Sequence, residues 1–194
     1  MTLLQIGLII LSGLPILSTA LLAYQLLRNG QGAFGTPTIL PWLFYPAKLL
    51  TGLLMVLLFW VSLRADFFLY FPRLIQTEIL EVQKLLALIF VLAGNLLLIP
   101  AYYSMSIFTR VGLPTKDHAL QTKGIYRISR NPMYTSFFFF FTACFLLIPS
   151  VAIAIIGLFC LVTHHFIILN EEKFLLKAFG TDYAEYRKNT SRYL

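Results

Sequence analysis

The amino-acid sequence predicts an all-α integral membrane protein with five transmembrane helices. Hydrophobic residues make up 59% of the 194 residues and only 12% are charged, which is more apolar surface than one soluble core of this length can bury. With histidines counted as neutral, no charge occurs in Met1–Leu27, Leu85–Thr109 or Asn131–Asn170. Each run reaches the ~20 residues that an α-helix needs to cross the hydrocarbon of a bilayer.

The last of these runs is long enough for two helices. Pro149 and Ser150 divide it, because a proline removes a helical hydrogen-bond donor and clashes with the preceding turn. A further apolar stretch, Leu49–Leu63, can also span if Lys48 and Arg64 at its ends reach toward the interface. We therefore expect five helices, of which the last two form a tight hairpin, at Leu3–Leu27, Ala47–Phe68, Val82–Met105, Met133–Ile148 and Val151–Leu169.

The distribution of basic residues predicts an orientation. If the N-terminus lies outside, eleven of the fifteen Lys and Arg residues fall on the cytoplasmic side, and only Arg64, Arg73 and Lys84 fall outside. Cytoplasmic loops of membrane proteins collect Lys and Arg. The net charge of +7 is thus explained by membrane orientation and attraction to anionic headgroups. No nucleic-acid partner is expected, because that would need basic residues on one soluble face.

The chain is expected to form a single membrane domain over residues 1–194. Residues 1–107 are mainly a transmembrane scaffold, whereas chemically varied side chains concentrate in residues 108–194, the expected cofactor-binding and catalytic portion. The loop Thr109–Asn131 is expected to cover the cytoplasmic face. The helical periodicity of Glu171–Phe179 extends the fifth helix beyond the bilayer, and Gly180 is a natural stop before a short final helix.

Three weaker patterns are given structural interpretations. Gly30–Gly35 matches G-x-G-x-x-G, but it follows a membrane helix instead of a strand, so we assign it to a loop. Three histidines, His118, His164 and His165, are too few for a histidine-rich di-iron site, and the adjacent His164 and His165 point about 100° apart on a helix, so helix packing or pocket lining is expected and no metal site. Cys144 and Cys160 are expected to pack as small apolar groups without forming a bridge.

Two glutamates, Glu171 and Glu172, directly follow the last uncharged run. Carboxylates at a membrane boundary can be simple surface charges. In a functional interpretation, one of them binds a cationic group, such as the α-ammonium of an amino-acid-like cofactor, through a charge-assisted hydrogen bond. Their position alone favours neither interpretation.

The most specific feature of the sequence is a pair of motifs around the predicted hairpin. The first contains Thr122, Gly124, Tyr126, Arg130, Asn131, Pro132 and Tyr134; the second contains Glu171, Glu172, Leu175, Phe179, Gly180, Tyr183 and Tyr186. Together they resemble the signature of the isoprenylcysteine carboxyl methyltransferase family of integral membrane enzymes. The resemblance covers roughly Thr115–Arg187, and the five-helix topology agrees with what this family would require.

The resemblance implies an S-adenosylmethionine-dependent methyltransferase. By position, it implies cofactor contacts from His118, Ala119, Leu120, Gln121, Gly124, Tyr126, Asn131, Pro132, Met133, Tyr134 and Glu171. Glu171 would pair with the cofactor's ammonium, and aromatic faces would lie near the adenine or the sulfonium. The implied acceptor is the C-terminal carboxylate of a prenylated cysteine that enters sideways from the bilayer. No base is needed, because a carboxylate with a pKa near ~3.5 is already ionised.

The chain departs from this family at one place. Family members commonly carry arginine two or four residues before the first glutamate, as a proposed clamp for the substrate carboxylate, whereas this chain has Leu169 and Ile167. Arg130 or a residue of the basic loop could substitute for it.

Three alternatives remain open at this stage. A phospholipid amine N-methyltransferase would have similar C-terminal motifs and would need a base, for which Glu172 is a candidate. A sterol-type membrane reductase would use a nicotinamide cofactor and generally has more helices. A non-enzymatic membrane scaffold or haem carrier would make the two motifs a coincidence.

Overall fold

The computed structural model describes residues 2–30, 36–64, 79–105 and 120–194. Its helices are α1 (Leu3–Arg28), α2 (Pro41–Leu63), α3 (Glu81–Met105), α4 (Pro132–Leu147) and α5 (Val151–Asn189), with a short 3₁₀ helix, η3 (Gly124–Arg127), before α4. These described segments contain no β-strand, only an isolated parallel bridge between Ser129 and Ser191. The prediction of an all-α protein is therefore confirmed.

Four of the helices, α1, α2, α3 and α5, are long and apolar enough to cross a membrane. The fifth, α4, is equally apolar but has 16 residues, which corresponds to roughly 24 Å at the rise of an α-helix. A multi-pass membrane protein is thus supported by four candidate spans, and the fifth span stays a prediction.

Among the helix starts, the largest difference from the expected boundaries is in α2. We expected this helix to begin at Ala47, but it begins six residues earlier, at Pro41. A proline in the first helical position costs no hydrogen bond and has a φ angle suited to the helix. Pro46 lies inside the helix, as apolar membrane helices tolerate. The helix ends at Leu63, and Arg64 is already non-helical, with φ −123° and ψ 89°, so it stops short of the expected end at Phe68, which itself lies outside the described residues.

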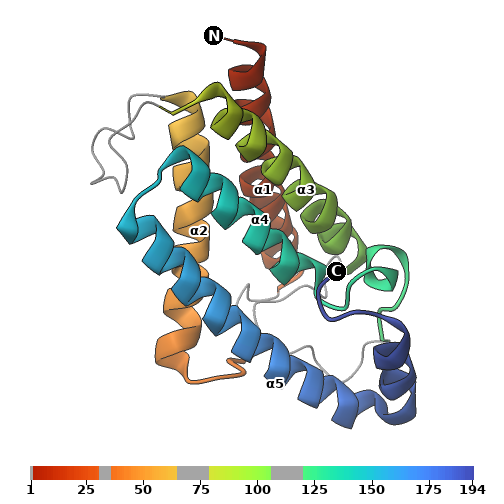
Figure 1. Ribbon diagram of the computed structural model, residues 1–194. Coiled ribbons are helices and arrows are strands. Elements are labelled where there is room, and N and C mark those ends of the chain that lie inside the picture. Colours follow the sequence, from red (N-terminus) through yellow and green to blue (C-terminus); the bar gives the residue numbers. More distant parts are fainter. Residues whose placement is uncertain (1, 31–35, 65–78, 106–119) are drawn as a thin grey trace.

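The helices are arranged so that the segments bearing the sequence motifs meet. Helix α4 lies along α3, and the chain then turns through only three residues, Ile148–Ser150, into α5 (Figure 1). The start of α4, the end of α3 and the charged half of α5 lie toward the same end of the molecule (Figure 1). Ser150 caps α5 by accepting a hydrogen bond from the Ile153 backbone amide.

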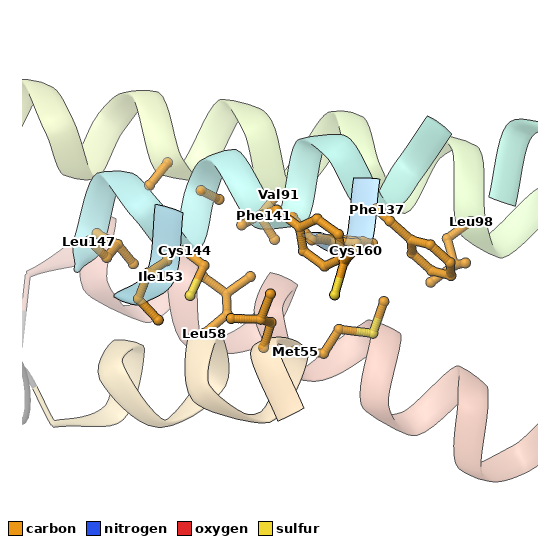
Figure 2. Close-up of a cluster of buried hydrophobic side chains, with 14 of the residues drawn as sticks. Met55, Leu58, Val91, Leu98, Phe137, Phe141, Cys144, Leu147, Ile153 and Cys160 are labelled. Carbon is orange, nitrogen blue, oxygen red and sulfur yellow. The ribbon is translucent and has the colours of Figure 1, made fainter. Parts of the chain in front are cut away.

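The interior between α2, α3, α4 and α5 is filled by aliphatic, aromatic and sulfur-containing side chains. Figure 2 shows this cluster, which includes Met55, Leu58, Val91, Leu98, Phe137, Phe141, Cys144, Leu147, Ile153 and Cys160. Cys144 and Cys160 are both fully buried and both free, as the sequence predicted.

Two contacts of α3 fix its distance from its neighbours. A Cβ atom on Gly94 would lie 2.7 Å from the ring of the buried Phe140 of α4, so this residue must be glycine for the two helices to approach so closely. The Asn95 side-chain amide donates to the carbonyl of Leu11 in α1, 2.8 Å away, and interhelical hydrogen bonds of this kind help to fix the packing of membrane helices.

Helix α5 continues well past its apolar half, as the sequence predicted. It is interrupted at Gly180, which has φ 53° and ψ −120°, a conformation that favours glycine because it has no Cβ atom. After this break the chain turns back, and its last residues, Thr190–Leu194, return to the start of α4 (Figure 1).

Candidate cofactor-binding site

The first turn of α4 and the charged half of α5 meet at Tyr134 and Glu171. The Tyr134 hydroxyl donates a hydrogen bond to Glu171 Oε1 at 2.8 Å, and accepts one from Lys48 Nζ of α2 at 3.3 Å. The Lys48 ammonium also lies 4.5 Å from the centroid of the Tyr134 ring. Three helices therefore meet through one chain of polar contacts, from Lys48 through Tyr134 to Glu171.

The neighbouring carboxylate, Glu172, faces a different group of residues. It is buried and forms ion pairs with two arginines: Arg130 Nη2 lies 3.1 Å from its Oε1, and Arg192 Nη2 lies 3.0 Å from its Oε2. The Asn131 side-chain amide donates a further hydrogen bond to Oε1 at 3.3 Å. The interpretation of this glutamate as a surface charge is therefore wrong, because its charge is buried and neutralised internally.

The two adjacent glutamates are separated in function by helix geometry. Successive residues of an α-helix point about 100° apart, so Glu171 faces Tyr134 while Glu172 faces the arginines. In the part of the chain that the structure describes, the Glu171 carboxylate accepts a single hydrogen bond, from Tyr134. It therefore retains acceptor capacity for a cationic ligand, which Glu172 does not.

Arg130 is held by four hydrogen bonds to the protein. Its Nε and Nη2 atoms donate to Glu172, and its Nη1 atom donates to the carbonyls of Arg187 and Thr190 at 2.9 and 2.6 Å. The side chain is 7% exposed. The suggestion that Arg130 replaces the missing clamp for a substrate carboxylate is therefore not supported, because four of its five N–H donors are already used.

The C-terminal residues close over the segment before α4. The Arg130 backbone amide donates to the Ser191 carbonyl at 2.9 Å, and the Asn131 side chain donates to the Arg192 carbonyl at 3.2 Å. The hydrogen bonds to Glu172 raise the pKa of Arg192 above its ordinary value, so this guanidinium is a fixed positive charge. The tail and α4 are thus held together through Glu172.

The 3₁₀ helix η3 places Tyr126 in contact with the last part of α5. Its carbonyl accepts a hydrogen bond from the Tyr186 hydroxyl at 2.6 Å. Burial, with smaller contributions from Tyr186 and Glu171, raises the pKa of Tyr126, so its hydroxyl stays neutral. The Gln121 side chain donates to the Ser104 carbonyl at 3.3 Å. This hydrogen bond connects the segment before η3 to the end of α3.

A pocket of about 430 Å³ opens beside Tyr134, between α4 and α5. Its lining is mostly apolar and aromatic, from Tyr134, Thr135, Phe138, Phe139, Leu161, His164, His165, Ile168, Tyr193 and Leu194. The ring of His164 is buried against Tyr134 and Phe137, with centroids 5.4 and 5.2 Å apart. This histidine therefore packs within the site, and no group of three or more potential metal ligands occurs among the described residues.

The residues expected to hold a cofactor are described in part. His118 and Ala119 lie outside the described residues. Leu120, Gln121, Gly124 and Tyr126 lie in the loop and η3; Asn131, Pro132, Met133 and Tyr134 begin α4. Of these, Tyr134 contacts Glu171 directly, whereas Asn131 is bonded to Glu172.

Sequence reasoning missed two residues of this site. The sequence predicts Lys48 only as a residue at the membrane boundary, although a lysine beside an otherwise apolar stretch is a signal for a function in the membrane. Arg192 was counted only for its charge, and nothing in its local sequence indicates that it pairs with a glutamate twenty residues earlier.

The comparisons with known proteins agree with this geometry. A family model described as phospholipid methyltransferase matches residues 82–182, which include η3, α4, Tyr134 and both glutamates. A curated relative, protein-S-isoprenylcysteine O-methyltransferase of Schizosaccharomyces pombe, is 33% identical over 125 residues, covering 61% of this chain. The chain spans about half, 52%, of the length of that relative. Because the family model matches more than half of its residues, the chain belongs to the phospholipid methyltransferase family.

Proposed function

We propose that this protein transfers a methyl group from S-adenosylmethionine to the C-terminal carboxylate of a prenylated cysteine. The main observation behind the proposal is that the two glutamates have different partners. Glu172 is neutralised by Arg130 and Arg192, whereas among the described residues Glu171 accepts a hydrogen bond only from Tyr134. A carboxylate held in this way suits the ammonium of an amino-acid-like cofactor.

When bound, S-adenosylmethionine would supply an electrophilic methyl carbon, and transfer to a carboxylate oxygen would give a methyl ester and S-adenosylhomocysteine. The protein's own contribution would be alignment and exclusion of water. Tyr134 orients Glu171. The cluster of Glu172 with Arg130, Asn131 and Arg192 holds the start of α4 in place. The further cofactor contacts expected from the sequence, in the segment from His118 to Tyr126, belong to the same proposal.

The pocket beside Tyr134 favours an acceptor with a lipid chain. Its volume of about 430 Å³ is within the range of small-molecule sites, and its aromatic lining lies within the apolar part of α4 and α5. The relative from Schizosaccharomyces pombe is named for an isoprenylcysteine substrate. We propose that the pocket receives the prenyl chain while the carboxylate stays near Tyr134.

Methylation of a lipid amine fits the site less well. Such an acceptor must lose a proton, and the candidate base was Glu172. Its two oxygens accept hydrogen bonds from two guanidinium groups, which hold it as an ionised structural group. A carboxylate acceptor needs no base, because it is ionised at neutral pH.

The proposed topology has five spans, the N-terminus outside, and the site on the cytoplasmic side. The helix α4 would span with its flanking residues and a slightly thinner bilayer, at a modest cost. Cysteine residues introduced singly at Thr2 and Lys177 test this: in sealed vesicles of known orientation, a membrane-impermeant maleimide should label them from opposite sides.

The decisive experiment is calorimetric titration of the detergent-purified protein with S-adenosylhomocysteine, followed by transfer of labelled methyl groups. N-acetyl-S-farnesylcysteine and vesicles containing phosphatidylethanolamine serve as the two acceptors. Saturable binding and a base-labile methyl ester on the prenylcysteine are expected. Folded protein that does not bind S-adenosylhomocysteine would refute a methyltransferase, and transfer to the lipid amine alone would refute the prenylcysteine acceptor.

A further inference from the structure

We propose that Lys48 binds the carboxylate of the acceptor, and so makes α2 part of the substrate site. The inference deepens the proposed function and rests on it. The carrying observation is that Lys48 Nζ hydrogen-bonds to the Tyr134 hydroxyl at 3.3 Å, while the same hydroxyl donates to Glu171 at 2.8 Å.

The position of Lys48 in its helix calls for an anionic partner. It is the eighth residue of α2, roughly 10 Å along the helix axis from the first residue, and it is followed by a long apolar run. A cation at such a depth is costly unless a nearby group compensates it, and it therefore indicates a functional site. In the proposed topology α2 begins on the cytoplasmic side, so Lys48 would lie near the interface, where the headgroup of a lipid-anchored molecule would be found.

The nearest groups around the Lys48 ammonium are two aromatic rings and one hydroxyl. The Nζ atom lies 4.5 Å from the Tyr134 ring centroid and 5.6 Å from that of Phe44. Aromatic faces attract a cation through their quadrupoles but carry no net charge. The ammonium is therefore oriented by two rings and one hydroxyl, and the compensating negative charge is that of Glu171, on the other side of the hydroxyl.

The nearby arginines are not available for this task. Arg130 and Arg192 both pair with Glu172, and Arg130 also bonds to backbone carbonyls. At positions 167 and 169 the chain has apolar residues, and Ile167 is fully buried. Among the described residues, Lys48 is the cation whose hydrogen bond reaches the Tyr134–Glu171 pair.

The charges of the site and of the two ligands match one another. Without ligands, Lys48 and Glu171 carry opposite charges on either side of the Tyr134 hydroxyl. If Glu171 pairs with the ammonium of the cofactor, Lys48 loses part of its compensation, and a carboxylate restores it. An unpaired charge that is partly withdrawn from water is unfavourable, so a carboxylate acceptor should be preferred to a neutral analogue of the same shape.

The test compares two acceptors that differ only in charge. Full-length protein in detergent is saturated with S-adenosylhomocysteine and titrated with N-acetyl-S-farnesylcysteine or with its carboxamide. The wild type should bind the carboxylate roughly tenfold more tightly or better, since a charge-assisted hydrogen bond contributes most of such a difference. Lys48→Met should bind both acceptors about equally, and Lys48→Arg should retain the preference.

The affinity for S-adenosylhomocysteine separates the outcomes. In Lys48→Met it should stay within about threefold of the wild-type value, which also shows that the variant is folded. An undiminished preference for the carboxylate in this variant would overturn the inference alone. If Lys48→Met lost as much affinity for S-adenosylhomocysteine as for the carboxylate acceptor, the inference would also be overturned, because Lys48 would then act through Glu171. Wild-type protein that does not bind S-adenosylhomocysteine would overturn the proposed function, and this inference with it.

Discussion

Tyr134 and Glu171 are 37 residues apart in sequence, and the 2.8 Å hydrogen bond between them joins the first turn of α4 to the point where α5 changes from apolar to charged. The chain between them is the α4–α5 pair, so the bond closes the open end of two antiparallel helices. The same tyrosine ring packs against His164 of α5, with centroids 5.4 Å apart. The position of the Glu171 carboxylate therefore depends on how the two helices pack.

Glu171→Gln should weaken cofactor binding while preserving the fold. The substitution keeps an oxygen for the Tyr134 hydroxyl but removes the negative charge. Hydrogen bonds to charged groups contribute about 1.5–3 kcal/mol, so the Kd for S-adenosylhomocysteine should rise about tenfold or more. Glu185→Gln, at an exposed position near the end of α5, is the matched control. Equal affinities for both variants would exclude Glu171 from the cofactor site.

Glu172→Gln should act on stability instead. The carboxylate is 6% exposed and faces two guanidinium groups, and breaking a buried ion pair by removing one partner costs roughly 3–5 kcal/mol. Arg192→Met should cost less, because the Arg192 side chain is 30% exposed and Arg130 still compensates Glu172. Thermal unfolding in detergent and protease cleavage after Lys188 measure the two effects. The opposite order of destabilisation would contradict this account of the cluster.

Much of the fold follows directly from the pattern of apolar and charged residues. The expected helices start at the observed residues for α1 and α5, and within one residue of them for α3 and α4. The start of α2 was missed because Pro41 and Pro46 look like loop residues. Proline's cost depends on its place in the helix, which the sequence alone does not fix.

The site was predictable only where a motif marks it. Tyr134 and Glu171 belong to the two motifs, and the structure brings them into contact. The contact of Lys48 with Tyr134 joins residues 86 positions apart on different helices, and the rotation of α2 that produces it depends on the packing of the whole bundle. The roles of Glu171 and Glu172 likewise depend on which helix face meets α4, so their sequence could not distinguish them.

Cys144 and Cys160 should resist labelling in the native protein. Both side chains have an exposed fraction of zero and belong to the interior cluster between the helices (Figure 2). A water-soluble maleimide should therefore react with them only after denaturation, because a buried thiol in apolar surroundings is inert. Lys177→Cys, at an exposed position of α5, should react at once under the same conditions. Fast reaction of the native cysteines would show that α4 and α5 pack differently.

Gly94→Ala tests the close approach of α3 to α4. An alanine Cβ would lie 2.7 Å from the Phe140 ring, and Phe140 is only 1% exposed, so the ring has little room to move. Overpacking of this kind costs about 1–3 kcal/mol, which exceeds the gain of up to about 1 kcal/mol that alanine gives over glycine in a helix. A lower thermal midpoint in detergent is expected.

The control for this variant is Gly52→Ala, because a Cβ at Gly52 of α2 has no neighbour within 4 Å. There the helix propensity acts without a clash, so the thermal midpoint should stay the same or rise. The two substitutions are chemically identical and differ only in what faces the added methyl group. If both shifted the midpoint in the same direction, the contact with Phe140 would not be what sets the spacing of α3 and α4, on which the placement of Tyr134 depends.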